Sequence, residues 1–360
     1  MKIVTVVGAR PQFIKATAVS HRIRERYSDR VEEVLLHTGQ HFDYNMSAVF
    51  FDELELPVPK YNLGISGGSH SVMTGRMMAG IEEVLITEHP DRLLVYGDTN
   101  STLAASLAAV KLGVPVAHVE AGVRSFRLDM PEEVNRLVTD RVSSLLFCPT
   151  TTAVDNLKHE GIFRGVHKVG DVTFDLLTRY IEPARRTSTI LERLQLEHGR
   201  FALATCHRAE NTDNPDRFLC ILEALAQIAV EIPVILPLHP RARKIAEKLD
   251  QLRKYPGLHL VDPQPFLDMI TLEQAARVIL TDSGGLQKEA FFFNVPCITL
   301  RDETEWVETV SLGANVLVGT SREKILSAFA LAMHWRPVAN RDQPFGNGHA
   351  SDAILEILAG

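Results

Sequence analysis

The sequence has 360 residues, 45% of them hydrophobic, and its 38 Lys and Arg against 45 Asp and Glu give a net charge of −7. At roughly 150 residues per domain this length predicts two domains or one large barrel. The composition excludes a largely disordered chain, and the acidic balance disfavours binding to nucleic acid. No apolar stretch resembles a signal peptide or approaches the roughly 20 residues of a membrane span, so we expect a cytoplasmic protein without a membrane partner.

The four cysteines stand singly in the sequence, at Cys148, Cys206, Cys220 and Cys297. Without a C-x-x-C pair they fit neither a zinc site nor a disulfide framework. We expect them to be buried small hydrophobic side chains in a reducing compartment.

Short runs of Val, Ile and Leu alternate with longer amphipathic stretches along the whole chain. This alternation predicts an α/β protein with parallel sheets covered by helices on both faces. The expected strands are residues 3–7, 33–37, 93–96, 116–119, 145–148, 166–168, 201–205, 234–238, 258–261, 278–280 and 297–300.

The apolar rhythm breaks near Gly170, before a polar helix-prone segment and a new strand at Phe201. We therefore expect an N-terminal domain of residues 1–169 plus 346–360 and a C-terminal domain of residues 170–345. Residues 93–122 and 277–303 share one plan, a strand, a Thr/Asp/Gly/Ser turn, a helix and a Val-Pro strand start, which indicates two doubly wound domains. Whether this is internal homology or the common form of any βαβ unit stays open.

The turn after the first strand reads Gly8-Ala-Arg-Pro-Gln-Phe-Ile-Lys15. It lacks the three glycines of a dinucleotide fingerprint, so a resident NAD is not expected. Gly8 and Arg10 could hold a phosphate by charge, whereas the alternative is a surface helix with two solvated cations.

Acidic residues follow two later strands, Asp98 after Tyr96 and Glu120 after Val119. Carboxyl ends of neighbouring parallel strands meet at one sheet edge, where carboxylates are often functional. A third acidic element, the adjacent Glu132 and Glu133, begins a helix behind Pro131, and for Glu133 we favour a simple interaction with the helix dipole.

In the second half, His207-Arg208 and His239-Pro-Arg follow strands and favour an anion site over a metal site. Another strand leads into Thr281-Asp-Ser-Gly-Gly-Leu-Gln-Lys-Glu289. Its small residues would expose helix N-terminal amides to a diphosphate, and Glu289 could accept the two hydroxyls of a ribose. The segment is no Walker A loop, so it predicts a nucleoside-diphosphate site without kinase machinery.

These motifs, in order GARPQFIK, TGQH, YGDTNST, HVEAGVRS, MPEEVNR, VGDVTFD, TCHRAEN, LHPR, TDSGGLQKEA and LRDETEW, resemble the non-hydrolysing UDP-N-acetylglucosamine 2-epimerase family over essentially the whole chain. The resemblance implies a glycosyltransferase-B-like fold, in which two Rossmann-like domains face each other across a cleft. It also implies a C-terminal helix, Asp352 to Leu358, that returns to the first domain, and a homodimer.

The family reaction exchanges UDP-GlcNAc and UDP-ManNAc by eliminating UDP to 2-acetamidoglucal and adding it back, for cell-surface polysaccharide synthesis, with no cofactor and no metal. By motif match the catalytic positions are Asp98, Glu120, Glu132, His207 and Lys15. The substrate-binding positions are Arg10, Arg208, His239, Phe266, Ser283, Gly284, Gly285, Glu289 and Arg301. Asp98 and Glu132 are the candidates for proton transfer, while Phe266 would contact uracil.

Many bacterial members carry a GQHR-type motif that helps bind a second UDP-GlcNAc as activator, whereas this chain reads Gly39-Gln-His-Phe-Asp-Tyr44. This departure argues against activation by substrate. The QHFDYNMS and TEWVE segments also look like a branch that contains UDP-2,3-diacetamido-2,3-dideoxyglucuronate 2-epimerases, so that substrate is the alternative. A glycosyltransferase of the same fold and a sugar-nucleotide sensor remain the other hypotheses.

Overall fold

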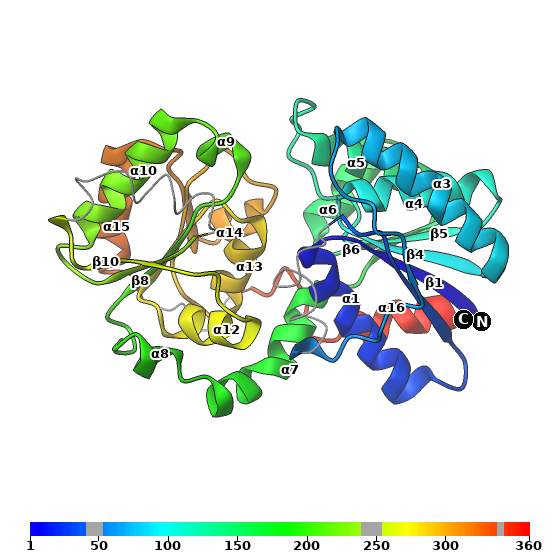
Figure 1. Ribbon diagram of the computed structural model, residues 1–360, viewed down its shortest axis with the longest axis horizontal. Coiled ribbons are helices and arrows are strands. Elements are labelled where there is room, and N and C mark those ends of the chain that lie inside the picture. The colour runs from blue at the N-terminus through cyan, green and yellow to red at the C-terminus, as the bar shows by residue number, and fades with distance from the viewer. Residues whose placement is uncertain (41–52, 239–253, 337–341) are drawn as a thin grey trace. The chain divides into compact units, whose positions relative to one another are not determined.

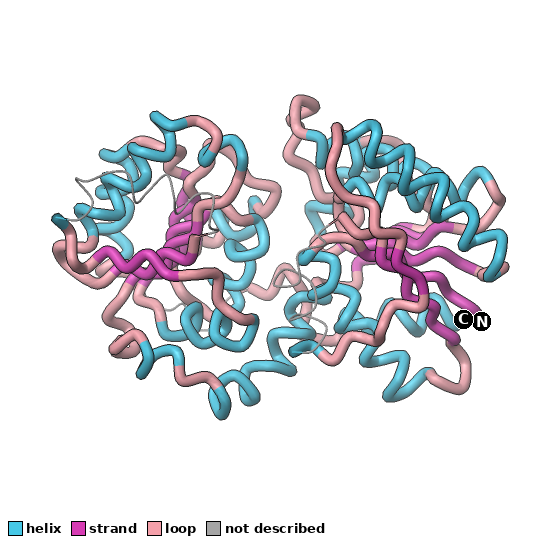
Figure 2. Tube along the Cα trace, viewed as in Figure 1, coloured by secondary structure: helices cyan, strands magenta, loops and turns pink. Residues whose placement is uncertain are grey.

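The computed structural model describes residues 1–40, 53–238, 254–336 and 342–360. The chain forms two compact units, which are described separately: unit 1 contains residues 1–178 and 343–360, and unit 2 contains residues 179–342. In both units helices flank a parallel sheet (Figure 2), as the alternation of apolar runs predicts.

Unit 1 contains a parallel sheet with the strand order β3-β2-β1-β4-β5-β6-β7. Because the order reverses between β1 and β4, the turns that follow these two strands lie at the switch point where doubly wound sheets bind ligands. The strands are β1 (Lys2–Val7), β2 (Glu32–His37), β3 (Tyr61–Asn62), β4 (Arg92–Tyr96), β5 (Val116–Val119), β6 (Leu145–Cys148) and β7 (Val166–Lys168).

Helices cover both faces of this sheet, with α3 and α4 on one face and α1 and α16 on the other (Figure 1). Alternate strand residues such as Val4, Val6 and Val95 pack against α3 and α4. The helices of unit 1 are α1 (Arg10–Arg22), a π-helical turn η1 (Ile23–Tyr27), α3 (His70–Glu88), α4 (Asn100–Lys111), α5 (Pro131–Val142), α6 (Thr151–His159), α16 (Ala350–Ala359) and the first part of α7 (Val172–Thr187).

Unit 2 has a six-stranded parallel sheet with the strand order β10-β9-β8-β11-β12-β13, which repeats the order of the first six strands of unit 1 and lacks a counterpart of β7. Its switch point lies between β8 and β11. The strands are β8 (Ala202–Thr205), β9 (Val234–Pro237), β10 (Leu258–Val261), β11 (Val278–Thr281), β12 (Cys297–Thr299) and β13 (Asn315–Leu317). The helices, besides the end of α7, are α8 (Ile190–Arg193), α9 (Ala209–Thr212), α10 (Pro215–Ile228), α12 (Phe266–Ala275), α13 (Gly284–Phe292), α14 (Val307–Ser311) and α15 (Arg322–Ala332).

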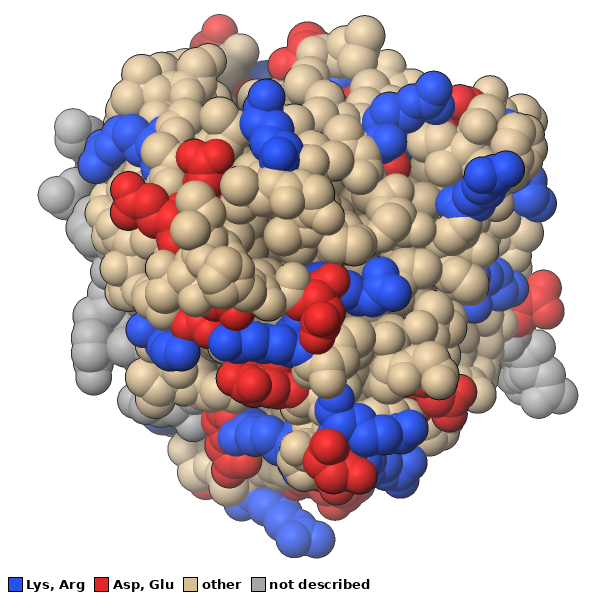
Figure 3. All heavy atoms as spheres, turned by 90° about the vertical axis from the view of Figure 1, so that its right-hand side faces the viewer, with Lys and Arg blue, Asp and Glu red and all other residues tan. Residues whose placement is uncertain are grey.

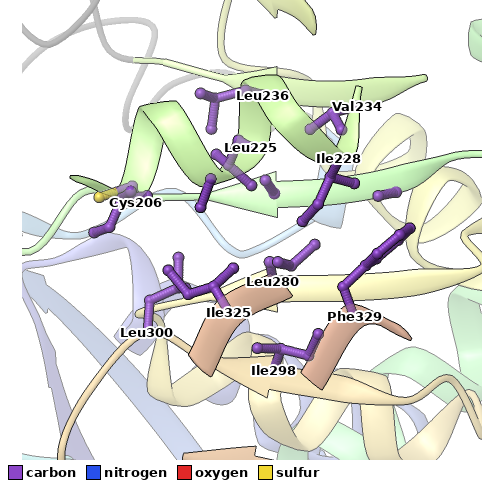
Figure 4. Packing of buried hydrophobic residues seen from close by; sticks show 14 of the residues in the cluster. Cys206, Leu225, Ile228, Val234, Leu236, Leu280, Ile298, Leu300, Ile325 and Phe329 are labelled. Atoms are coloured by element: carbon purple, nitrogen blue, oxygen red, sulfur yellow. The ribbon is translucent and has the colours of Figure 1, made fainter. Parts of the chain in front are cut away.

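Two buried clusters hold the unit 2 sheet between its helices. On one face Val234, Leu236 and Leu280 pack against Leu225 of α10 and Phe329 of α15 (Figure 4). On the other face the alternate strand residues pack against α8, α12 and α13. The central strands β8, β9, β11 and β12 are therefore apolar on both sides, which explains their continuous apolar runs in the sequence.

All the expected strands are present, with ends that differ by at most a residue or two, and the C-terminal helix α16 belongs to unit 1 as expected. Two short edge strands, β3 and β13, were not expected, because two or three residues are too few to form a recognisable apolar run. One expectation is wrong: Cys220 is exposed, since it lies on the solvent side of α10, whereas Cys148, Cys206 and Cys297 are buried.

The expected domain boundary at residue 169 falls within unit 1, which extends to Thr178. Side-chain contacts explain why the start of α7 belongs there. Asp175 accepts hydrogen bonds from the backbone N–H groups of Ala350 and Ser351 at the start of α16 (3.0 and 2.7 Å). A Cβ on Gly170 would lie 2.8 Å from the carbonyl oxygen of Phe345.

Candidate active site

The turn after β1 is bound to the end of β4 by one buried glutamine. Gln12 Oε1 accepts hydrogen bonds from the N–H groups of Gly8 and Ala9 (2.9 and 3.1 Å), and Gln12 Nε2 donates to the carbonyl of Tyr96 (3.0 Å). Gly8 must lack a side chain, because a Cβ there would lie 2.1 Å from Thr38 Oγ1. This close packing places Arg10, half-buried at the start of α1, at the switch point of unit 1.

Lys15 and Glu120 form an ion pair at this switch point. Lys15 Nζ lies 2.5 Å from Glu120 Oε1, and the two side chains are only 12% and 10% exposed. Glu120 has a φ of +71°, which costs a non-glycine residue on the order of 1–3 kcal/mol. Neighbouring Gly97 (φ +61°) leaves room for the pair, since its Cβ would lie 3.1 Å from Lys15 Nζ.

Asp98 is held by the helix that follows β5. Arg136 of α5 donates to Asp98 Oδ2 (2.5 Å), and Asn135 Nδ2 donates to the Asp98 carbonyl (2.8 Å). The Asp98 side chain remains 26% exposed, whereas Arg136 is 4% exposed. Glu132 is half-buried in the first turn of the same helix. Helix α5 thus orients one predicted carboxylate and carries another.

Glu133 is more than a helix-dipole partner, contrary to our expectation. Its side chain is buried and accepts hydrogen bonds from Ser125 N and Oγ, Phe126 N and Arg136 Nη1, all at 2.8–2.9 Å. Burial alone would raise the pKa of Glu133, but the Ser125 and Arg136 contacts lower it below its ordinary value. The carboxylate therefore fixes the loop before α5 and orients Arg136 toward Asp98.

At the switch point of unit 2, buried Asp282 holds the turn that carries His207. Its carboxylate accepts from the backbone N–H groups of His207 and Arg208 (3.0–3.1 Å) and from Asn211 Nδ2 (3.1 Å). His207 Nδ1 lies 3.4 Å from Asp282 Oδ1, and the imidazole is 60% exposed. Asp282 therefore presents an exposed histidine while remaining inaccessible itself.

Helix α13 begins beside this turn with two glycines. Ser283 caps the helix by accepting a hydrogen bond from Leu286 N (3.4 Å). The first two amides of the helix belong to Gly284 and Gly285, which carry no side chain. A Cβ on Gly284 would lie 3.3 Å from Glu305 Oε1, whereas Gly285 is less crowded. Such a helix start is suited to binding an anion.

Two predicted arginines converge on Glu305. Arg208 Nη2 lies 3.4 Å from Glu305 Oε1, and the buried Arg301 donates to Glu305 Oε2 (2.7 Å). The structure thus gathers Arg208, Arg301 and Gly284 around one carboxylate. Glu305 and Asp282 were missed as site residues because nothing in their local sequence shows which distant cations and amides they contact.

The remaining predicted residues lie elsewhere or are not described. Glu289 is half-buried on α13, one turn after the glycines. Phe266, at the start of α12, is buried and packs edge-on against Tyr180 with 5.7 Å between ring centroids. His239 and most of the Gly39–Tyr44 segment lie outside the described residues.

Further properties concern metals, membranes and surface charge. Within the described ranges, no three His, Cys, Asp or Glu side chains are grouped to hold a metal ion. None of the described helices has the length and apolarity to cross a membrane. On the face drawn in Figure 3, Lys and Arg side chains are interspersed with Asp and Glu.

Comparison with known proteins assigns the family. The model of the family described as UDP-N-acetylglucosamine 2-epimerase matches residues 23–359. The chain belongs to this family. This match confirms the family that the motifs predict, and the family's reaction class is that of an isomerase. The predicted α/β fold class is confirmed by the two parallel sheets and by the match to solved structures.

Relatives of this 2-epimerase cover its whole length. It is 52% identical to the UDP-2,3-diacetamido-2,3-dideoxy-D-glucuronate 2-epimerase of Pseudomonas aeruginosa, over 100% of this chain and 99% of that protein. It is 50% identical to a UDP-N-acetylglucosamine 2-epimerase homolog of Methanococcus maripaludis, over 99% of each. The structure matches the Methanocaldococcus jannaschii UDP-GlcNAc 2-epimerase in complex with UDP-GlcNAc and UDP with a TM-score of 0.92, 40% identity and 99% coverage of both chains.

Proposed function

We propose that this 2-epimerase interconverts UDP-GlcNAc and UDP-ManNAc. The observation that carries the proposal is the set of carboxylates at the unit 1 switch point, where Asp98 and Glu120 are each bound to a cation. Family membership supplies the reaction class, and the geometry supplies groups for moving protons. A helix start flanked by His207 and Arg208 in unit 2 supplies a site for the diphosphate.

Carbon 2 of the sugar has no neighbouring carbonyl to acidify its hydrogen, so direct deprotonation is too slow. Elimination avoids this difficulty. A base removes the proton from carbon 2 while the bond from carbon 1 to the diphosphate oxygen breaks, and the electron pair of the C–H bond forms the C1–C2 double bond. UDP then adds back as an acid returns the proton to the opposite face of carbon 2.

In unit 1, Asp98 and Glu132 transfer the protons on the two faces. Glu120, paired with Lys15, either acts directly or orients a neighbour. Placement of Asp98 by Arg136 and Asn135 supports its role, because a base must be held near the reacting atom.

The nucleotide is bound mainly by unit 2. Its diphosphate contacts His207, Ser283 and the amides of Gly284 and Gly285, which stabilise it as a leaving group. Glu289 binds the ribose. Further contacts to the phosphates, sugar or uracil are assigned to Arg10, Arg208, His239, Phe266 and Arg301, of which Phe266 has the weakest support because its ring packs against Tyr180. A homodimer, a cytoplasmic location and a role in polysaccharide synthesis belong to the same proposal.

Reaction in deuterated water tests the elimination. We expect UDP-GlcNAc to yield UDP-ManNAc with deuterium at carbon 2 and no added cofactor, as measured by NMR and mass spectrometry. Complete retention of the original hydrogen in the product would contradict the proposed route.

A second candidate substrate is UDP-2,3-diacetamido-2,3-dideoxyglucuronate, which the 52% identity to the Pseudomonas aeruginosa enzyme supports. Both candidates undergo the same change at carbon 2 and would use the same residues. The ratio of kcat/KM for the two nucleotide sugars, measured with one enzyme preparation, decides between them. If kcat/KM is at least tenfold higher for the uronate, the uronate becomes the proposed substrate in place of UDP-GlcNAc.

A further inference from the structure

Behind the candidate carboxylates of unit 1 lies a histidine that faces two acceptors. His118, in the middle of β5, is fully buried. Its Nε2 lies 2.7 Å from the carbonyl oxygen of Gly97, and its Nδ1 lies 2.6 Å from Asp140 Oδ1. A backbone carbonyl can only accept a hydrogen bond, and so can an ionised carboxylate. Both bonds therefore require that both ring nitrogens carry protons.

Asp140 has the surroundings of an ionised carboxylate. Its side chain on α5 is fully buried, which by itself would raise its pKa, but His118 and Arg124 lower the pKa below its ordinary value. Arg124 Nη1 lies 2.7 Å from Asp140 Oδ2, and Arg124 in turn binds Glu160 through Nε and Nη2 (2.7 and 2.8 Å). Two cations and two anions thus alternate, so the charge of His118 is balanced within the network.

The same carboxylate also fixes the turn that contains Glu120. Asp140 Oδ2 accepts from the backbone N–H of Gly122 (3.0 Å). Gly122 has a φ of +78°, and a Cβ there would lie 2.3 Å from the carbonyl oxygen of Ala153, so this turn is closely packed. One buried pair therefore contacts the residue before Asp98 and the residue two positions after Glu120.

We propose that His118, as an imidazolium paired with Asp140, is the positioning residue that sets the two turns carrying Asp98 and Glu120. Neither His118 nor Asp140 touches the substrate. Both act through the backbone at Gly97 and Gly122, and a neutral imidazole could hold only one of its two acceptors. Misplacing catalytic groups by about 1 Å can cost on the order of 100-fold in rate. The inference rests on the proposed function, because the rate it concerns is that of 2-epimerisation.

The matched control is Glu88, another buried acid of unit 1. It binds Lys2 Nζ (2.5 Å), Lys60 Nζ (2.6 Å) and Tyr61 (2.5 Å) near the start of β1, at the opposite end of the strands from the turns. Glu88→Gln removes a buried charge without touching the Gly97 or Gly122 turns. His118→Gln and Asp140→Asn are compared with it at equal thermal stability, by choosing the assay temperature at a fixed interval below each Tm.

For His118→Gln and Asp140→Asn we expect kcat to fall at least about 100-fold, with KM and the Kd for UDP within threefold of wild type. Glu88→Gln should keep kcat within about threefold. Because the two residues act as one unit, the double variant should lose no more than about threefold beyond either single variant. A loss of kcat no larger than that of Glu88→Gln would overturn the proposal.

A second measurement does not depend on activity or on the folding of a variant. In wild-type protein with 15N-labelled histidine, both His118 nitrogens should show the chemical shifts of protonated nitrogens between pH 7 and 8, with the signals assigned by their loss in His118→Gln. A neutral His118 would overturn the inference. If the wild type instead shows a protonated His118 but epimerises neither candidate nucleotide sugar, the proposed function fails.

Discussion

Asp98 of unit 1 and Asp282 of unit 2 follow equivalent strands of two sheets whose first six strands have the same order, yet their environments differ. Asp98 follows β4 after one intervening glycine, contacts Arg136 and is 26% exposed. Asp282 directly follows β11 and is fully buried, with hydrogen bonds from His207, Arg208 and Asn211. One fold position therefore supplies an accessible acid in unit 1 and a buried anchor in unit 2.

The two turns explain this difference. In unit 1, Gly97 adopts a φ of +61° before Asp98, and Thr99 caps the next helix. In unit 2 no residue intervenes, and Ser283 caps α13. An added left-handed glycine thus moves the acid away from the sheet interior. The comparison teaches that equivalent topology does not give equivalent chemistry, because a change of one residue in a turn redirects a side chain.

The largest expected effect is the fall in kcat when the exposed Asp98 is replaced. Asp98→Asn should lower kcat about 1,000-fold, because proton transfer of this kind contributes roughly 10²–10⁴ in rate. Affinity for UDP should stay within tenfold, about 1.4 kcal/mol. Steady-state kinetics and calorimetric UDP titration measure the two quantities. Glu132→Gln should behave in the same way, and loss of UDP binding in both variants would make them binding or structural residues.

Asp282→Asn should instead lower the free energy of unfolding and weaken UDP binding. An amide can replace only part of the acceptor capacity of the carboxylate, so buried N–H groups lose their partner. We expect a loss of roughly 2–3 kcal/mol in the free energy of unfolding. Because the His207–Arg208 turn is released, the Kd for UDP should rise about tenfold. Denaturant unfolding and UDP titration check this, and a variant of normal stability and UDP affinity but reduced kcat would remove the contrast between the units.

A smaller effect tests the helix start in unit 2. A Cβ on Gly284 would lie 3.2 Å from Trp306 Nε1 and 3.3 Å from Glu305 Oε1, whereas the nearest atom to a Cβ on Gly285 lies 3.7 Å away. Gly284→Ala should therefore weaken UDP binding about fivefold, ~1 kcal/mol, by displacing these side chains. Gly285→Ala is the matched variant and should change the Kd less than Gly284→Ala. Equal effects would show that crowding at Glu305 does not shape the nucleotide site.

The smallest effect concerns stability in unit 1 far from the chemistry. Hydrogen bonds from Lys2, Lys60 and Tyr61 lower the pKa of Glu88 to about 2, against an ordinary value of about 4.3. A lowered folded-state pKa stabilises the protein above the ordinary value, and this contribution disappears as the pH falls toward 2. The Tm difference between wild type and Glu88→Gln should thus be constant from pH 7 to about 5 and shrink below pH 4. A difference independent of pH would contradict this.

The local sequence predicted most of the fold and part of the site. Apolar runs predicted the main strands, since a strand covered on both faces must be apolar along its length. The acids, histidines and glycines after those strands indicated the turns that form the candidate site at each switch point. The motifs around Gly8, Glu120 and Gly284 identified the family, because each combines a backbone requirement with a chemical group.

Only the tertiary structure decided which charged groups pair. Arg136 lies 38 residues from Asp98 along the chain, and Asp140 lies 22 residues from His118. Likewise, the local sequence differs by one glycine before Asp98, but it does not show that the N–H groups of His207, Arg208 and Asn211 converge on Asp282. Periodicity and turn chemistry depend on neighbours within a few residues, whereas these pairings depend on how helices pack on the sheet. The sequence by itself therefore determined where chemistry could occur, and packing decided which of these carboxylates are exposed and which are buried.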